Sequence, residues 1–363
     1  MIQKFGIVIF ALLGIACFAM FFVLKQASTK TGEVAKPTPP VTLQLDTVPL
    51  GTISMCGDVL VAGNDHGELR IFSQRVVNSK PQIFQLSKYA ITAPVLEKNG
   101  LYYVGDVSGM FWAFDPVMGT VKWSYKTGNQ IIGQAVWHND MVFVGSHDCD
   151  FYAFQPETGE LLFKIECHGE INAAPVISER LNAVFFGNCD GFLRKIDIAA
   201  KSVVGTFDME SPIPENIVMR DDTLYVLAHG GNLAAIDCET FEMTYRVKTP
   251  NEYLSSPYAT ETFLFLTDYN GDIHVHLRED GTRLTTLQSP EKMTALQAGD
   301  DSRVFAVSTR GKLYQWQREN DQWHETLLAD LQTDCRQSCV LTGNHLFIAD
   351  DSGGLFYYDC GEK

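Results

Sequence analysis

Basic residues are scarce in this sequence. Its 363 residues include 28 Lys and Arg against 44 Asp and Glu, which gives a formal net charge of −16. An acidic surface repels phosphate backbones, so this balance argues against nucleic acid as a partner. No run of like charge stands out, and we interpret the excess acid as dispersed over surface loops. With 45% hydrophobic residues, the chain is expected to be an ordered globular protein.

Motifs that carry catalysis are also missing. No glycine-rich phosphate loop precedes a helix, and no Gly-x-Ser-x-Gly elbow occurs. The nine histidines show no metal-ligand spacing. His274 and His276 project to one face of a predicted strand, but one pair of imidazoles is too little for a structural zinc site, so we expect exposed or half-buried strand residues. We therefore predict no catalytic, cofactor-binding or metal-binding residue, no cofactor, and a protein that is not an enzyme.

One uncharged apolar run stands near the N-terminus. Phe5 to Leu24 is 20 residues without a charge, flanked by lysines on both sides. At 1.5 Å per residue this run matches a hydrocarbon core of roughly 30 Å, so we predict an uncleaved signal anchor, a transmembrane helix, over residues 1–25. Two alternatives stay open: a cleaved signal peptide, for which Cys17-Phe18-Ala19 is a poor site, and lipidation at Cys17.

A tether is predicted over residues 26–41, which are rich in Thr, Ser, Gly and Pro without an apolar period. The positive-inside rule does not decide the orientation, because lysines stand on both sides of the apolar run. A short N-tail before a large folded domain favours a single-pass protein of the inner membrane with its domain in the periplasm, if the source is bacterial.

A block of alternating strands and turns recurs eight times. Its second copy reads LYYVGDVSGMFWAFDPVMGTVKWSY, from Leu101. One turn position marks every block, at intervals of 40 or 42 residues: Gly67, Gly109, Cys149, Gly191, Gly231, Gly271, Gly311 and Gly353. Glycine suits a two-residue hairpin turn because it tolerates positive φ. Cys149 is the exception, and in that block we expect Asp150 to adopt the positive φ.

Each block predicts four antiparallel strands and leaves no room for a crossover helix. Short segments of small residues that begin at Ile91, Ile171 and Leu254 are predicted as innermost strands, where blades crowd the central axis. Turns that end in Gly119, Gly159 and Gly281 lead to the outermost strands. Four strands at a period of about 40 residues predict an all-β, eight-bladed β-propeller over residues 42–363.

The ring needs a closing strand. The last block stops at Cys360, just after its third strand, and Val41 to Val48 is strand-like. We predict that this segment supplies the outer strand of the last blade, which would join both ends of the domain and remove exposed edges.

The blocks resemble the pyrroloquinoline-quinone (PQQ) repeat, the blade unit of quinoprotein alcohol dehydrogenases. The matching residues are Ala113-Phe114-Asp115, Gly119 and Trp123 in block two, and Ala153-Phe154, Thr158-Gly159 and Phe163 in block three. The resemblance covers roughly residues 42–360. It implies that Trp123, with Phe163 and Tyr245 in its place elsewhere, docks neighbouring blades. Among smaller family members, the chain is similar to the eight-bladed scaffold lipoprotein of the outer-membrane barrel-assembly machinery, which carries a lipobox cysteine in place of a spanning helix.

The same resemblance raises the hypothesis of a quinone-dependent dehydrogenase. Such enzymes need a catalytic Asp, a calcium site and an adjacent Cys-Cys pair over the cofactor, and calcium alone takes six to eight oxygen ligands. No two cysteines are adjacent here, and the regular spacing leaves no room for the loops that build the family's pocket. PQQ-dependent chemistry or small-ligand binding is therefore kept as the alternative function.

Polar residues near the innermost strands are the remaining candidates for a site. They are Asn172, Glu215, Asn216, Gln297, Arg336 and Gln337, and they are expected to line the central channel. Glu215 and Arg336 fall in blades 5 and 8, so they are candidates to face each other. A water-filled channel with satisfied polar walls is the simpler interpretation, and a small-molecule site is the alternative.

Eight cysteines follow the apolar run: Cys56, Cys149, Cys167, Cys189, Cys238, Cys335, Cys339 and Cys360. In an extended strand Cys335 and Cys339 would lie about 13 Å apart, beyond disulfide reach. Cys149 and Cys189 occupy nearly equivalent turns of adjacent blocks and are the better disulfide candidate, with buried free thiols as the alternative.

Taken together, these observations predict a membrane-anchored propeller scaffold that binds envelope proteins and neither nucleic acid nor a small-molecule substrate. Outer-membrane protein assembly, or another envelope complex, is the expected setting. A sensor whose tether transmits ligand binding is a further alternative.

Overall fold

The computed structural model describes residues 41–44, 48–73, 80–249, 252–253, 256–335 and 339–361. The predicted signal anchor, Cys17 and the tether up to residue 40 lie outside these ranges. Within them, no helix is both long enough and apolar enough to cross a bilayer. All the described residues belong to one compact unit, Pro39–Lys363.

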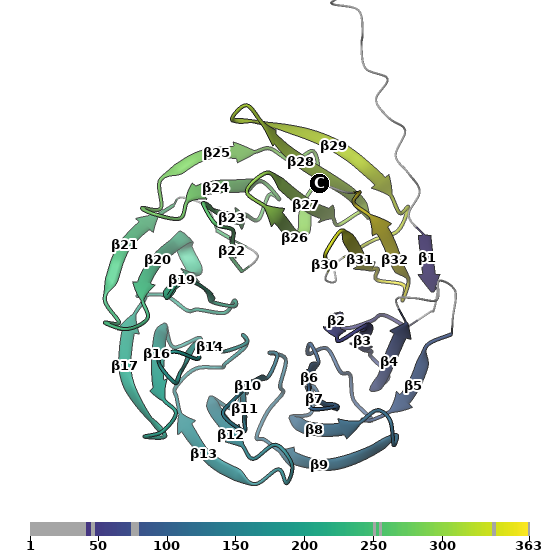
Figure 1. Ribbon diagram of the computed structural model, residues 1–363, viewed down its shortest axis with the longest axis vertical. Coiled ribbons are helices and arrows are strands. Elements are labelled where there is room, and N and C mark those ends of the chain that lie inside the picture. The colour runs from purple at the N-terminus through teal and green to yellow at the C-terminus, as the bar shows by residue number, and fades with distance from the viewer. Residues whose placement is uncertain are drawn as a thin grey trace, which may run out of the picture. The chain divides into compact units, whose positions relative to one another are not determined.

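This unit is a ring of eight four-stranded antiparallel sheets, as Figure 1 shows. The all-β, eight-bladed prediction is therefore confirmed. From the channel outward, the first four blades are β2 (Ser54–Cys56), β3 (Val59–Gly63), β4 (Glu68–Ser73), β5 (Gln82–Gln85); β6 (Leu96–Lys98), β7 (Leu101–Gly105), β8 (Met110–Asp115), β9 (Thr120–Lys126); β10 (Val136–His138), β11 (Met141–Gly145), β12 (Asp150–Phe154), β13 (Leu161–Glu166); and β14 (Val176–Ser178), β15 (Ala183–Gly187), β16 (Phe192–Asp197), β17 (Ser202–Asp208).

The second half of the ring repeats this plan, with one 3-10 turn, η1 (His229–Gly231), in blade 5. Its blades are β18 (Val218–Arg220), β19 (Thr223–Ala228), β20 (Asn232–Asp237), β21 (Met243–Lys248); β22 (Tyr258–Ala259), β23 (Phe263–Thr267), β24 (Ile273–Leu277), β25 (Arg283–Leu287); β26 (Met293–Asp300), β27 (Arg303–Ser308), β28 (Lys312–Glu319), β29 (Gln322–Asp330); and β30 (Cys339–Thr342), β31 (His345–Ala349), β32 (Leu355–Asp359), β1 (Val41–Gln44).

The eighth blade confirms the predicted closure. Its sheet order is β30, β31, β32 and then β1, the first described strand of the chain. β1 pairs antiparallel with β32, Val41 opposite Tyr357 and Thr42 opposite Phe356. The outermost strand of the last blade thus comes from the opposite end of the domain, which ties the ring together.

All eight marker residues adopt positive φ, from +73° at Cys149 and Gly311 to +95° at Gly271. The expected two-residue turns are wrong. In blade 2, Asp106 N–H donates to Met110 O (2.9 Å) and Gly109 N–H to Asp106 O (3.0 Å), so the loop has three residues and ends in a left-handed one. This geometry puts the left-handed angle on the residue before the next strand. In blade 3 that residue is Cys149 itself and not Asp150.

Crossing loops carry the chain from each outermost strand back to the channel. The segments at Ile91 and Ile171, predicted as innermost strands, belong to these loops, and the strands β6 and β14 follow them. Their N–H groups bond to hairpin carbonyls, Ile91 to Asn64 O (2.9 Å) and Ile171 to Ser146 O (3.2 Å), instead of to a neighbouring strand. Leu254, the third predicted start, lies outside the described residues.

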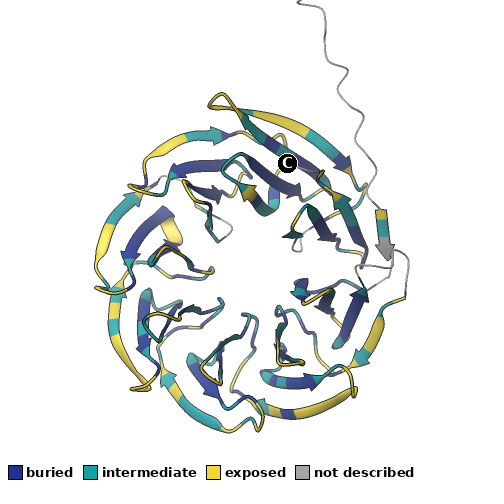
Figure 2. Ribbon diagram, in the orientation of Figure 1, coloured by how far each residue is buried: buried dark blue, intermediate teal, exposed yellow. Residues whose placement is uncertain are grey.

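The core lies between blades. Figure 2 shows the middle strands buried and the outermost strands largely exposed. Trp123 of β9 is buried, and its Nε1–H donates to Pro156 O of blade 3 (2.5 Å). A Cβ on Gly159 would lie 2.6 Å from the Trp123 ring, so the ring can pack against this position only because it is glycine. Tyr245 docks blade 5 on blade 6 in the same way, with its hydroxyl donating to Arg278 O (3.0 Å). These contacts agree with the docking role that the family resemblance implied.

Candidate functional site at the channel mouth

A buried polar residue stands three positions before the marker in seven of the eight blades. We call these clasp positions: Asn64, Asp106, Ser146, Asn188, Asp268, Ser308 and Asp350. Asp106 is representative. Its carboxylate accepts from Ser108 N (2.9 Å) and Met110 N (3.0 Å) of its own hairpin, and from Ser87 Oγ (2.6 Å) of the preceding crossing loop. Six of the seven clasp side chains accept from backbone N–H groups of their own hairpin, whereas Asn188 instead accepts from Arg194 and donates to Gly169 O of the adjacent loop.

Sequence reasoning missed the clasps, although they share the spacing of the marker glycines. The one exception is Ala228 in blade 5, which cannot accept a hydrogen bond through its side chain. There the loop winds into η1, with Gly230 at φ +73° and Gly231 at φ +77°. The backbone of blade 5 thus takes a different path where the clasp is absent, and it leaves His229 exposed.

The residue after each clasp position joins its hairpin to a crossing loop through the main chain; we call these residues the rim. Seven such bonds occur among the described residues, from rim N–H to loop carbonyl: Val107 to Ala90, His147 to Gln130, Cys189 to Glu170, His229 to Pro212, Tyr269 to Glu252, Thr309 to Lys292, and Asp351 to Asp334. They are 2.8 to 3.0 Å long. These bonds join the hairpins of seven blades to the crossing loops on this face of the ring.

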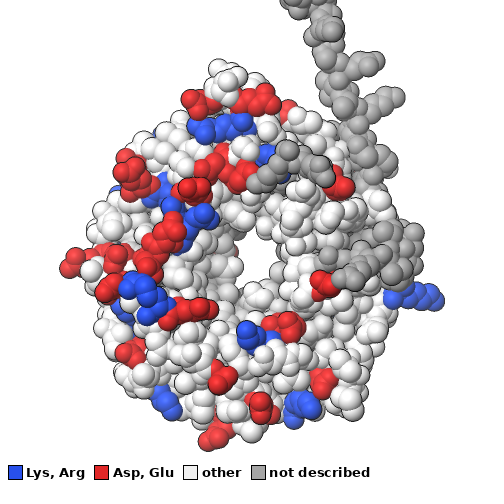
Figure 3. All heavy atoms as spheres, viewed as in Figure 1, with Lys and Arg blue, Asp and Glu red and all other residues white. Residues whose placement is uncertain are grey.

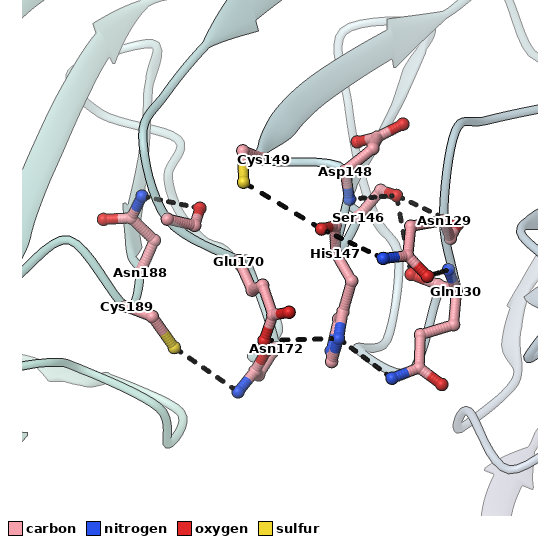
Figure 4. A network of polar contacts seen from close by, with 11 residues as sticks. Asn129, Gln130, Ser146, His147, Asp148, Cys149, Glu170, Asn172, Asn188 and Cys189 are labelled. Carbon is pink, nitrogen blue, oxygen red and sulfur yellow. Dashed lines mark hydrogen bonds and ion pairs between the residues drawn. The ribbon is translucent and has the colours of Figure 1, made fainter.

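Figure 4 shows the rim between blades 3 and 4. His147 Nδ1 lies 2.9 Å from Gln130 Nε2 and 3.6 Å from Glu170 Oε2. Its side chain is only 9% exposed, and Nε2 is buried without a hydrogen-bond partner. Beside it, Asn172 Nδ2 donates to Cys189 Sγ (3.7 Å), while Asn172 Oδ1 is buried and unpartnered. This sector of the rim holds two buried polar atoms whose hydrogen-bonding capacity is unused.

A cavity of about 340 Å³ opens in the wall of the channel. It is lined by the approach to β2 and by the crossing loops of blades 2 to 5: Thr52, Pro94, Ile132, Gly133, Gln134, Asn172, Ala173, Ala174, Pro214, Glu215 and Asn216. Three of the six predicted channel residues, Asn172, Glu215 and Asn216, are thus brought together.

The other three predicted channel residues have different outcomes. Gln297 of β26 is not part of the cavity wall; its Nε2 donates to Cys339 O of blade 8 (3.2 Å) and so links two innermost strands. Arg336 and Gln337 lie outside the described residues, as does the suggested pairing of Arg336 with Glu215. Among the described residues, Asn172 Oδ1 has no hydrogen-bond partner from the protein, and the water-filled channel stays a prediction.

Glu215 is the acidic group of the cavity. Burial raises the pKa of its carboxyl above the ordinary value of 4.5, although Ser256 Oγ donates to Oε2 at 3.5 Å and His229 opposes the rise. The folded state therefore holds the Glu215 proton more tightly than the unfolded chain does.

This shift predicts the pH dependence of a Glu215→Gln variant. Ionisation of Glu215 costs folding free energy, and the cost is absent below the unfolded pKa and complete above the folded one. We expect the Gln variant to be more stable than the parent at pH 7.5, with the difference vanishing toward pH 4. Urea unfolding at both pH values measures it, and an equal difference at the two would contradict the argument.

All eight cysteines within the propeller are free, including Cys149 and Cys189, so the disulfide candidate is not formed in this structure. Cys149 Sγ instead contacts His147 O at 3.9 Å. Burial raises the pKa of the Cys56, Cys238, Cys335 and Cys339 thiols to about 12.

Such thiols hold very little thiolate at neutral pH, and the thiolate is the reactive species. We expect slow alkylation of the native propeller at pH 7.5 and eight labels from residues 56–360 after unfolding, with or without reductant. Mass spectrometry counts the labels. A pair that appears only after reduction would contradict the free-thiol arrangement.

The two strand histidines are fully buried, contrary to expectation. His274 Nε2 lies 2.9 Å from Asp268 Oδ2, so the histidine extends the clasp of blade 6. His276 Nδ1 contacts Gly281 O at 2.9 Å, and burial lowers the pKa of the ring. No group of three or more His, Cys, Asp or Glu among the described residues is arranged to hold a metal ion.

Two tyrosines stand exposed on this face. Tyr269, a rim residue, is 50% exposed and carries Lys292 Nζ 5.2 Å from its ring centroid. Tyr89, in the crossing loop from β5 to β6, is 57% exposed. In Figure 3, Asp and Glu spread around the ring with Lys and Arg among them, in line with dispersed acidity, and the channel is open at the centre.

Comparison with known proteins agrees with this architecture. The sequence model of a family described as outer membrane protein assembly factor BamB matches residues 113–201. A curated relative, outer membrane protein assembly factor BamB of Nitrosomonas eutropha, is 23% identical over 272 residues. The resemblance to PQQ-repeat propellers is confirmed. The match covers 73% of this chain and 57% of that BamB, so it spans little more than half the length of the curated relative.

Solved structures similar to this chain share its fold. BamB from Moraxella catarrhalis superposes with a TM-score of 0.73 at 16% identity, over 89% of this chain and 99% of that one. The computationally designed Ika8 protein superposes with a TM-score of 0.76 at 15% identity, over 89% and 100%. At these identities the likeness to BamB structures concerns the fold alone.

Proposed function

We propose that the chain is a non-enzymatic scaffold that holds other envelope proteins on the rim of its propeller, in the assembly of outer-membrane proteins. The seven main-chain bonds between rim residues and crossing loops carry this proposal, because a preformed surface loses little entropy on binding. The similarity to BamB supports it, since that relative is named an assembly factor.

The sector of blades 5 and 6 is the proposed contact point. Its clasp is missing at Ala228, His229 is exposed in η1, and the neighbouring rim residue Tyr269 is half exposed under Lys292. Tyrosine is enriched where protein partners bind.

Site-directed photo-cross-linking in intact cells tests this placement. A photoreactive residue at Tyr269 is expected to capture a discrete set of envelope proteins. The matched control is Val117, which is 88% exposed on the turn between β8 and β9 at the outer edge of the ring. Equal capture at both positions, or none at Tyr269, would argue against the rim as the binding surface.

The proposal includes a membrane anchor at residues 1–25, a tether that ends before Val41 of β1, and a propeller in the periplasm of a bacterial envelope. The uncharged run from Phe5 to Leu24 supports the anchor. Extraction of membranes with carbonate should leave the chain in the pellet, and protease added to spheroplasts should remove the propeller. The mass of the mature N-terminus distinguishes an intact anchor from cleavage or lipidation at Cys17.

A further inference from the structure

The channel cavity has the chemistry of a cation site. Asn172 and Glu215 are among its lining residues, Asn172 Oδ1 is buried beside it, and no Lys or Arg is among the described residues that line it. A bond from Ala174 N–H to Asn216 Oδ1 (2.7 Å) ties together the two loops that carry these acceptors. The acceptors therefore sit on a fixed frame that spans blades 4 and 5.

Both acceptors lack adequate donors. Asn172 donates its amide N–H to Cys189 Sγ, and its buried Oδ1 has no hydrogen-bond partner. Glu215 accepts from Ser256 Oγ at 3.5 Å, which is long for a hydrogen bond between hydroxyl and carboxylate. A half-buried carboxylate with one long hydrogen bond and a buried carbonyl without a donor both cost folding free energy. A ligand that brings positive charge and several N–H donors would relieve both costs.

We propose that this cavity binds a primary ammonium group, which donates to Asn172 Oδ1 and pairs with the Glu215 carboxylate. An ammonium carries three donors on a compact charge, so it can donate to more than one acceptor. The cavity of about 340 Å³ is large enough for the aliphatic chain behind it, against walls made by Pro94, Ile132 and Pro214.

Other ligand classes fit less well. A calcium ion takes six to eight oxygen ligands, and the described residues assemble no group of three metal-binding side chains. An anion would meet Glu215 with no cationic side chain among the described lining residues. The ammonium has two sources with the same chemistry: a free aliphatic polyamine, or a lysine of a bound protein.

Calorimetric titration with butane-1,4-diamine at 150 mM salt tests the site on the full-length protein. We expect saturable binding of the diamine and none of butane-1,4-diol, which has the same length without the charge. Glu215→Gln keeps the shape of the side chain and should weaken binding at least tenfold, and Asn172→Ala should weaken it as well. The control is Glu160→Gln, which removes an exposed acid from the outer edge of blade 3.

The outcomes separate a built site from general attraction to an acidic protein. Unchanged affinity in Glu215→Gln, or an equal loss in Glu160→Gln, would overturn the proposal, as would binding of the diol. A lysine-containing tripeptide and its acetyl-lysine form then distinguish the sources. Binding of the diamine alone indicates a free polyamine, whereas binding of the lysine peptide that acetylation abolishes indicates a partner's lysine. A raised melting temperature with diamine in the parent, absent in Glu215→Gln, is the independent readout.

Discussion

Replacing Gly109 with Ala is expected to destabilise the propeller by about 4 kcal/mol or more. Gly109 adopts φ +91°, and an added Cβ would lie 2.2 Å from Asn129 O and 2.8 Å from Asn129 C of the crossing loop. Real Cβ atoms do not approach a backbone carbonyl so closely, so the loop has to move. That movement breaks the bond from Thr127 N–H to Gly109 O (2.8 Å), which holds the loop on the hairpin.

The matched control is Gly57→Ala. Gly57 also has positive φ, +59°, but nothing lies within 4 Å of an added Cβ, so only the left-handed strain of about 1–2 kcal/mol is expected. Cys149 occupies the position of Gly109 in blade 3 at φ +73°, so this backbone angle alone is tolerated with a side chain. Urea unfolding of the two variants compares them, and similar losses of stability would show that the overlap with Asn129 is not the dominant cost.

The fold could be predicted from sequence because its strongest constraint is local. A left-handed residue is needed before the third strand of every blade, and glycine meets that need at Gly67, Gly109 and Gly191 with a regular spacing. The turn length could not be read in the same way. Two-residue and three-residue hairpin loops can both end in glycine. The loop length is decided by which carbonyl accepts the hydrogen bond from Gly109 N–H, and the sequence does not reveal that.

The clasp positions were not predicted from sequence because their residue types vary, although their structural role is the same. Asn64, Asp106 and Ser146 each provide a buried acceptor at the equivalent position of their blade, but they are three different residue types, so no single residue recurs in the sequence. Similarly, small residues at Ile171-Asn172-Ala173 suggested a crowded innermost strand. In the structure this segment is a crossing loop that bonds to the hairpin at Ser146 and lines the channel cavity. These contacts join segments that are far apart in the chain.

The channel residues illustrate the same limit. Asn172, Glu215 and Asn216 could be placed near the axis from their position in each block, and they do meet at one cavity. The kind of ligand that this cavity can bind could not be predicted from sequence. It depends on which polar atoms beside the cavity have no hydrogen-bond partner in the folded protein. Only the structure reveals that Asn172 gives its N–H to Cys189 and keeps Oδ1 unpartnered.

Loss of the closing strand is the second change with a large expected effect. Deleting residues 41–48 from the full chain removes β1 and the buried Val48, and it leaves β32 as an open edge. Leu355 and Phe356 of β32 are buried in the closed ring, so the edge would expose backbone donors and acceptors beside apolar side chains. We expect the apparent melting temperature to fall by about 5–10 °C and aggregation to follow unfolding.

Deleting residues 29–36 of the predicted tether is the control of equal length. Because these residues precede the closing strand, their loss should leave the melting temperature within about 1 °C of the parent. Scanning calorimetry at one fixed heating rate compares the three chains. The contribution of closure is the difference between the two deletions. If both deletions shift the transition equally, the pairing of Val41 with Tyr357 does not hold the ring together, and the eighth blade must be stable with three strands.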